Sequence, residues 1–279
     1  MITPKLRKYL KELICWILLA TALLWAVFPL LYTIISSFKL PTNIWEYPPS
    51  LAGPYSLANY QDLVLKWPSY FTNLKNSLIV TAGTGLVALS CSIFAAYALS
   101  RFKNRLVRWS ALSIIMVRMV PPIIITIPLF PLFNSLGLID KHVTLIILYS
   151  AFMVSLTTLI MKTFVDDVPV ALEEAATIDG CSRLQAFLKI TLPLSVPGVV
   201  TVIIFTSIFA WNEYLFAFIF TTFRAQTAPL VLSEFMGAIM GVQWGMLLAA
   251  AIIHLLPMIV LTWIMQKHLI KGMGFGAVK

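Results

Sequence analysis

The chain has 279 residues, of which 60% are hydrophobic and only 11% are charged, and its formal net charge is +9. Soluble domains are about 45–50% apolar and about 25% charged, so this composition excludes an ordinary water-soluble fold and indicates a membrane protein. Six long apolar runs occupy most of the length, which leaves no room for a separate soluble enzyme domain.

Each apolar run is close to the length of about 20 residues that crosses a bilayer as a helix. Helices are expected because hydrocarbon cannot satisfy unpaired backbone groups. The predicted membrane spans are Leu13–Ile35, Ser77–Leu99, Trp109–Phe133, Val143–Met161, Val196–Phe220 and Gly245–Met265. The third span is expected to be kinked or broken, because it contains Pro121, Pro122, Pro128 and Pro131.

The basic residues lie mostly on one side of the predicted spans. That side contains residues 1–12, the connection after the second span, the long connection 162–195 and residues 266–279. The opposite side contains only Lys39, Lys66, Lys75, Lys141 and Arg224. Because cytoplasmic loops carry the excess of Lys and Arg, both termini are predicted to be cytoplasmic, with the connection 36–75 outside. This distribution accounts for the net charge, so nucleic acid is not expected as a partner.

The connection 162–195 is predicted to contain two short helices. Pro169 is typical of the first turn of a helix, and Gly180 is well placed to end that helix. Ser182 and Gln185 fit a capping box, which predicts the start of a second helix, and Pro193 ends or kinks it. The first helix is rich in alanine, so another surface could approach it closely.

The same connection carries a motif of known spacing. The segment EAATIDGCSRLQAFLKITLP, which begins at Glu174, has E-A-A, three residues, G, nine residues and I-x-L-P without interruption. It resembles the loop of permease subunits of bacterial ABC importers that forms a coupling helix and sits in a cleft of the ATPase subunit. The resemblance implies that an ATPase subunit contacts Glu173, Glu174, Ala175, Ala176, Asp179 and Gly180. The alternative is an amphipathic surface helix with no special role.

Two further stretches narrow the resemblance. FAWNEYLFAF in the fifth span and LIKGMGFGAVK at the end of the chain are similar to the maltose-type branch of carbohydrate importers, specifically its second, shorter permease chain. In that branch the tail reaches between the two ATPase subunits. The resemblance therefore implies ATPase contacts for Gly272, Gly274, Gly276 and Lys279. The alternative is a basic, glycine-rich anchor at the lipid headgroups.

The resemblance implies an all-α membrane protein with the type I ABC importer permease fold in the bacterial cytoplasmic (inner) membrane. It divides the chain into a basic tail (1–12), a first transmembrane helix (13–35), an outer loop (36–75), a core permease domain (76–265) with the coupling loop at 162–195, and a cytoplasmic tail (266–279). The implied partners are a second permease chain in a heterodimer, two ATPase subunits that hold ATP and Mg, a periplasmic or surface-tethered solute-binding protein, and a carbohydrate. No cofactor is expected in this chain. The connection from Thr221 to Trp244 is the expected contact for the binding protein.

Two charged residues, Arg118 and Glu213, fall within the predicted spans. An intramembrane charge is expensive and is a functional candidate by default, so both residues, with Asn212, are predicted to border the substrate path. A neutral sugar would use the amide of Asn212, whereas an anionic sugar derivative would use the guanidinium fork of Arg118. The structural alternative is an ion pair between Arg118 and Glu213, or an arginine that extends to water.

Other functional classes lack their motifs. The chain has no G-x-x-x-x-G-K-[ST] phosphate loop and no H-E-x-x-H, and its three histidines show no metal-ligand spacing, so neither catalysis nor a metal site is expected. An ion-coupled secondary transporter would show an inverted repeat or more intramembrane carboxylates. A membrane enzyme would need several catalytic groups at one depth. An ABC permease for a non-sugar solute stays as the related alternative.

Overall fold

The computed structural model describes residues 4–49, 53–237 and 241–276, and all regular secondary structure in these ranges is helical. The prediction of an all-α fold is therefore confirmed. The described chain forms two compact units. One comprises the described residues up to Pro68 together with those in Leu232–Leu255, and the other comprises Ser69–Val231 with the described residues from Leu256 onwards.

The first unit begins with a long helix, α1 (Pro4–Ser37). No residue in its most apolar stretch of 18 residues is buried by other parts of the chain. It starts nine residues before the predicted span, so the residues expected as a basic tail are mostly helical. After a 3₁₀ turn, η1 (Pro41–Asn43), comes α2 (Ala58–Lys66). The side chain of Asn59 donates to the carbonyls of Ser37 (2.8 Å) and Lys39 (2.7 Å), which folds this connection against the end of α1.

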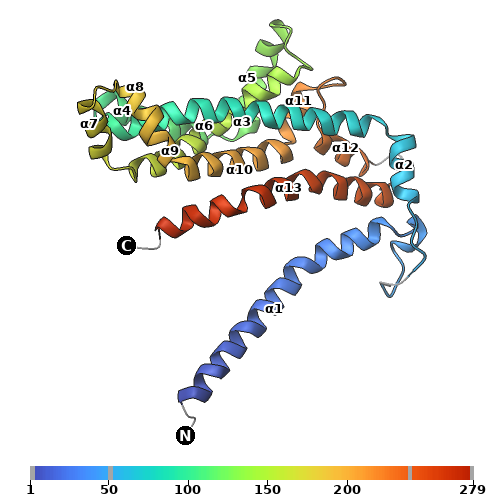
Figure 1. The fold of residues 1–279 in the computed structure, drawn as a ribbon. Helices are drawn as coiled ribbons and strands as arrows, with labels where there is room; N and C mark the ends of the chain where they lie inside the picture. Colours follow the sequence, from blue (N-terminus) through green and yellow to red (C-terminus); the bar gives the residue numbers. More distant parts are fainter. Residues whose placement is uncertain (1–3, 50–52, 238–240, 277–279) are drawn as a thin grey trace. The chain divides into compact units, whose positions relative to one another are not determined.

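The core of the second unit consists of α3 (Ser69–Arg101), α6 (His142–Asp166) and α10 (Val196–Asn212), which run side by side (Figure 1). Glycines allow close approach between them. A Cβ atom on Gly83 of α3 would lie 2.5 Å from Cδ1 of Ile146 on α6, and one on Gly198 of α10 would lie 2.7 Å from the Phe164 ring. The helices are therefore packed without room for even one added carbon at these crossings. Helix α3 starts eight residues before the predicted second span, inside the expected outer loop.

The third predicted span is broken, as its prolines indicate. Helices α4 (Arg105–Arg118) and α5 (Pro122–Ser135) meet at 95°. Pro121 has extended backbone and precedes α5, where a residue without a backbone N–H is tolerated. The prediction of a broken helix is therefore confirmed.

The fifth predicted span, Val196–Phe220, is interrupted in the structure. The chain leaves the helical conformation at Glu213 (φ −69°, ψ 129°), so that α10 ends at Asn212 and α11 (Leu215–Phe220) begins anew. The Glu213 carboxylate accepts the backbone N–H groups of Phe216 (2.9 Å) and Ala217 (3.3 Å). The first N–H groups of a helix have no acceptor within that helix. The Glu213 carboxylate supplies this acceptor for α11, so the helix can restart here although the surrounding run is apolar.

The remaining helices connect these elements: α7 (Val170–Ile178), α8 (Arg183–Ala186), a π turn η2 (Phe187–Thr191), α9 (Leu192–Leu194), α12 (Ala228–Glu234) and α13 (Trp244–Gly276). Within the described ranges, four helices are long and apolar enough to cross a membrane, or up to six if each of two bent pairs forms one span.

Candidate functional site

The loop between α6 and α10 has the backbone that its sequence predicts. Helix α7 follows Pro169 and ends at Ile178, and Gly180 has a φ of +89°, a conformation that residues with a Cβ rarely adopt. Ser182 and Gln185 then form the predicted capping box, in which each side chain bonds the other residue's backbone N–H. A turn at Gly180 therefore joins the two helices.

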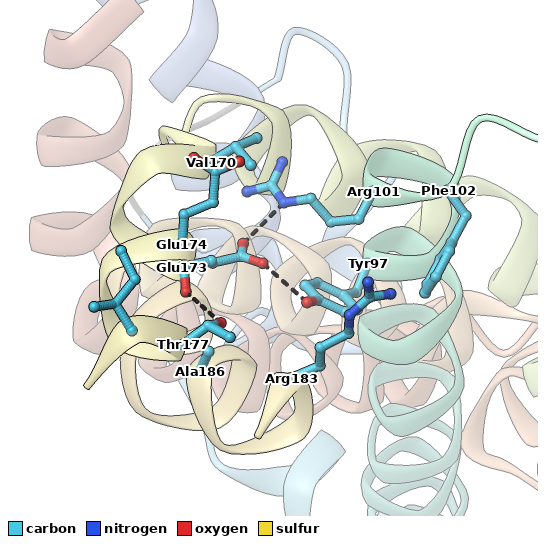
Figure 2. Close-up of a pocket in the computed structure, with 10 residues that line it drawn as sticks. Tyr97, Arg101, Phe102, Val170, Glu173, Glu174, Thr177, Arg183 and Ala186 are labelled. Carbon is cyan, nitrogen blue, oxygen red and sulfur yellow. Dashed lines mark hydrogen bonds and ion pairs between the residues drawn. The ribbon is translucent and has the colours of Figure 1, made fainter. Parts of the chain in front are cut away.

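A buried carboxylate joins this loop to the helix bundle. Glu173 points inward from α7 (Figure 2), and its Oε1 atom accepts from Nε of Arg101 (2.8 Å) and from the hydroxyl of Thr191 (2.7 Å). Its Oε2 atom accepts from the hydroxyl of Tyr97 (2.9 Å). These donors belong to α3 and to the π turn, so one side chain connects three elements. We call Glu173, Arg101, Tyr97 and Thr191 the clamp.

Arg101 extends the clamp to the end of α6. Its guanidinium also donates to the carbonyl of Val168 and to the hydroxyl of Ser100, each at 2.9 Å. Ser100 in turn donates to Asp166, which also forms an ion pair with Lys162. The last turns of α3 and α6 and the first turn of α7 are therefore held by one continuous network of polar side chains.

Burial and hydrogen bonding act in opposite directions on Glu173. Burial alone would raise the pKa of its carboxyl, because desolvation disfavours the charged form. The hydrogen bonds from Thr191, Arg101 and Tyr97, with the positive charge of Arg101, outweigh it, so that the pKa lies below its ordinary value. Within the clamp, Glu173 and Arg101 therefore form an ionised pair, and their side chains are only 10% and 11% exposed.

The opposite face of α7 is exposed. Glu174, Ala175, Asp179 and Gly180 lie on this face, whereas Ala176 is buried against the subunit. Ile178 is 87% exposed, which is unusual for a large apolar side chain at the end of a polar loop. Beside it, α7, α8 and the end of α3 border a groove of about 630 Å³, into which Arg183 and Phe102 project (Figure 2). The six residues predicted to contact the ATPase therefore separate into an outward set and the inward pair Glu173 and Ala176.

Among the described residues, no hydrogen bond or ion pair joins any two of the three residues predicted for the substrate path. Arg118 is the exposed last residue of α4, and its guanidinium lies 5.5 Å from the centre of the Phe152 ring. Asn212 is exposed and donates to the carbonyl of Ile208 (2.8 Å). Glu213 is buried and holds the start of α11, and although both side chains are described, it forms no ion pair with Arg118.

The C-terminal residues are only partly described. Helix α13 continues to Gly276, so Gly272, Gly274 and Gly276 lie on a helix, whereas Lys279 lies outside the described residues. Among the residues that the structure describes, no three His, Cys, Asp or Glu side chains come together as metal ligands would.

The clamp residues Arg101, Tyr97 and Thr191 were missed by sequence reasoning. Arg101 contributed only to the count of basic residues beside the spans. The available signal was a tyrosine and an arginine four residues apart at the end of an apolar run, Tyr97 and Arg101. It did not identify the partner, because Arg101 and Glu173 are 72 residues apart.

Comparisons with known proteins show the family to which this chain belongs. Residues 88–274 match the family described as "Binding-protein-dependent transport system inner membrane component". The chain is 34% identical over 278 residues to the trehalose/maltose transport system permease protein MalG of Thermococcus litoralis, with 94% of this chain and 96% of that protein covered.

Two solved structures share the fold. One is a bacterial ABC transporter involved in the import of the acidic polysaccharide alginate (TM-score 0.77, 21% identity, 96% of this chain and 98% of that chain). The other is a bacterial alginate ABC transporter in complex with an alginate pentasaccharide-bound periplasmic protein (TM-score 0.67, 13% identity, 93% and 94%). The protein therefore belongs to the family of binding-protein-dependent transport system inner membrane components, which are transport subunits and not enzymes.

Proposed function

We propose that this chain is the permease subunit of an ATP-binding-cassette importer for a carbohydrate. It pairs with a second permease chain in the bacterial inner membrane, two ATPase subunits bind its cytoplasmic face, and a solute-binding protein delivers the sugar from outside. Family membership and the similarity to a trehalose/maltose permease and to alginate transporters support this function. The periplasmic protein bound in one alginate transporter supports the binding-protein partner.

The observation that carries the proposal is the two-sided construction of α7. Its inner face is fixed to α3 and to the π turn by the clamp, while its outer face exposes Glu174, Ala175, Asp179 and Gly180. A surface helix without a binding partner does not require a buried ion pair to hold it in place. We infer that an ATPase subunit binds the outer face and Ile178, and that the C-terminal residues Gly272, Gly274, Gly276 and Lys279 add a second contact with the ATPases.

Transport follows from rigid coupling. When ATP binding brings the ATPase subunits together, each carries its coupling helix with it. Because Glu173 holds α7 against the ends of α3 and α6, displacement of α7 moves these helices rather than bending the loop. Helices packed at Gly83 and Gly198 with no spare volume move as a body. ATP hydrolysis then resets the inward- and outward-facing states, with ATP and Mg bound by the partner subunits.

Mutation of the outer face of α7 tests this assignment. Glu174→Lys reverses an exposed charge whose side chain forms no hydrogen bond or ion pair within the described part of the subunit, so it should abolish uptake and release the ATPase subunits while the chain still inserts. Asp62→Lys is the control, because it reverses a partly exposed charge on α2, in the other unit, that within the described residues pairs only with Lys66 of the same helix. Full uptake by the Glu174 variant, with ATPase subunits retained on purification, would remove the coupling role from this face.

The topology is proposed from the positive residues: six spans, both termini cytoplasmic, and the connections 36–75 and Thr221–Trp244 outside. Single cysteines at the exposed positions Tyr47 and Phe223 should react with an impermeant maleimide in intact cells, and one at Arg105 should react only after permeabilisation. The native cysteines are replaced first, since Cys15 and Cys91 are exposed. Labelling of Arg105 in intact cells would invert the orientation.

The substrate path is proposed to pass Asn212 and Arg118, whose polar groups are exposed. Glu213 contributes indirectly, because it fixes the break after Asn212. A neutral sugar would bond the Asn212 amide, whereas an acidic sugar would also bind Arg118. Arg118→Leu should therefore abolish transport of an acidic substrate and spare a neutral one, with Arg118→Lys as the charge-conserving control. Transport unchanged by Arg118→Leu and Asn212→Ala together would exclude this path.

A further inference from the structure

A second carboxylate, at the other end of the bundle, holds a loop in one conformation. Asp140 lies between α5 and α6 with a φ of +61°, and its backbone N–H donates to the carbonyl of Phe220 (2.9 Å). Its side chain accepts four consecutive backbone N–H groups, from Thr222 (3.1 Å), Phe223 (3.2 Å), Arg224 (3.0 Å) and Ala225 (3.0 Å). Four successive amides on one carboxylate leave residues 222–225 little conformational freedom.

Other side chains hold the same loop from α3 and α6. The amide of Asn76 donates to the carbonyls of Arg224 and Gln226, each at 2.9 Å, and the Asn76 carbonyl oxygen bonds Nε2 of His142 (2.8 Å). The hydroxyl of Ser77 accepts the N–H of Ala228 (2.9 Å). The backbone of residues 222–228 is therefore bonded on both its N–H and its carbonyl side.

The side chains on this fixed backbone point outward. Phe223 is 84% exposed and Arg224 is exposed, whereas Ala225 and Thr227 between them and α12 are buried. A phenylalanine side chain that is 84% exposed contributes little packing within the subunit. Aromatic and arginine side chains are the residues that contribute most at protein interfaces, and a backbone ordered before binding lowers the entropy lost on association.

The position of this loop determines which partner can reach it. Helix α6 separates Asp140 from the coupling loop by 25 residues, or about 37 Å, and Figure 1 shows α11 and α7 at opposite ends of α6. The ATPase subunits proposed at α7 therefore cannot contact Phe223. The partner that arrives at the opposite face of the membrane is the solute-binding protein.

We propose that Asp140 is a positioning residue that holds Thr222–Ala225 as a preformed contact for the solute-binding protein, with Phe223 and Arg224 as the contacting side chains. Arg224 fits an acidic or carbonyl-rich patch beside an apolar pocket on that protein. Aspartate suits position 140 because it tolerates a positive φ and also supplies the two acceptor oxygens. Glycine would supply only the backbone conformation. This inference rests on the proposed function, which supplies the binding protein.

The test uses the complete importer in nanodiscs and its ligand-loaded binding protein, and measures ATPase rate against binding-protein concentration. Asp140→Gly keeps the backbone conformation and removes the acceptors. Asp140→Asn keeps Oδ1, which meets all four N–H groups, but places an NH₂ group where Oδ2 accepts from Phe223 and Arg224.

We expect the binding-protein concentration that gives half-maximal ATPase stimulation to rise about tenfold for Asp140→Gly and Phe223→Ala, and less for Asp140→Asn. ATPase activity in the absence of binding protein should be unchanged. Glu12→Gln, an exposed carboxylate on α1, is the matched control.

Each outcome decides between alternatives. If Asp140→Gly lowers the yield of assembled complex and the basal ATPase rate without a change in half-maximal concentration, the residue only stabilises the fold and the proposal is wrong. If Phe223→Ala leaves the half-maximal concentration unchanged, the loop contacts lipid or another chain and the proposal is also wrong. If the wild-type importer is not stimulated by any binding protein, the proposed function itself fails.

Discussion

Removal of the arginine of the clamp is the most informative perturbation of the coupling loop. In Arg101→Met the side chain at position 101 keeps an apolar stem of similar length. It loses the ion pair to Glu173 and the hydrogen bond to the Val168 carbonyl. Loss of one partner from a buried ion pair typically costs about 3–5 kcal/mol. Because Thr191 and Tyr97 still donate to the Glu173 carboxylate, we expect the lower end of that range, about 3 kcal/mol.

Glu173→Gln should be milder. Its amide oxygen can still accept from Arg101 and Thr191, and the Tyr97 hydroxyl can reverse to accept from the amide nitrogen, so geometry is kept and only the charge is lost. Charge-assisted hydrogen bonds are roughly twice as strong as neutral ones, which gives a loss of about 1–2 kcal/mol. The expected order of damage is therefore Glu173→Gln, then Arg101→Met.

The assay compares the thermal midpoint of the purified complex with the number of ATP molecules hydrolysed per sugar imported in proteoliposomes. If the clamp transmits motion, Arg101→Met should raise ATP use per sugar while the ATPase subunits stay bound. The double variant Arg101→Met with Glu173→Leu should recover much of the thermal midpoint, because an apolar pair can replace a buried ion pair, but not the coupling. Unchanged ATP use per sugar in both variants would refute transmission through the clamp. Additive thermal losses in the double variant would refute the pairing.

Three further predictions concern the same unit. Gly180→Val should lose uptake because a β-branched residue cannot adopt a φ of +89° without strain, whereas Gly180→Asn should retain most of it; ATPase subunits retained on affinity purification are the measure. Gly83→Val should lower the thermal midpoint because its Cβ would meet Ile146 at 2.5 Å, and Ile146→Ala should partly restore it. The lowered pKa of Glu173 means that its ionised form stabilises the folded loop above the ordinary pKa of a glutamate, and this stabilisation is lost as pH falls through the lower folded-state pKa. The wild type should therefore lose stability relative to Glu173→Gln as the solution is acidified through that window, and parallel pH curves for the two proteins would contradict this.

Local features of the coupling loop could be predicted from the sequence because each rests on neighbouring residues. The conformation of Gly180, the capping box of Ser182 and Gln185 and the break at Pro121 all depend on residues within four positions of one another. Helical periodicity and backbone chemistry act at that range. The all-helical fold follows in the same way from apolar runs of membrane length.

Features that depend on distant residues could not be predicted. Glu173 pairs with Arg101 across 72 residues, and Asp140 bonds Arg224 across 84. The sequence shows a carboxylate in each case but not which way it points. Glu173 was predicted to face the ATPase because it adjoins the E-A-A motif, whereas its side chain faces the bundle. The break at Glu213 was missed for a different reason. The Asn212–Glu213 pair lies within a long apolar run, and hydropathy alone cannot reveal a side chain that caps a new helix.

The positions of the two carboxylates have a consequence for how the subunit works. Helix α3 carries Arg101 at one end and Asn76 and Ser77 near the other, so the same helix bonds both the coupling loop and the loop at residues 222–228. Its packing against α6 is close at Gly83, where an added Cβ atom would lie 2.5 Å from Cδ1 of Ile146. Under the coupling proposed above, a shift of α7 either moves Phe223 and Arg224 as well or breaks hydrogen bonds at one end of α3. Joint movement requires no hydrogen bond to be broken, so movement of the coupling loop and release of the binding protein should be linked. A variant that weakens the hydrogen bonds of Glu173 or Asp140 should uncouple this movement from the release.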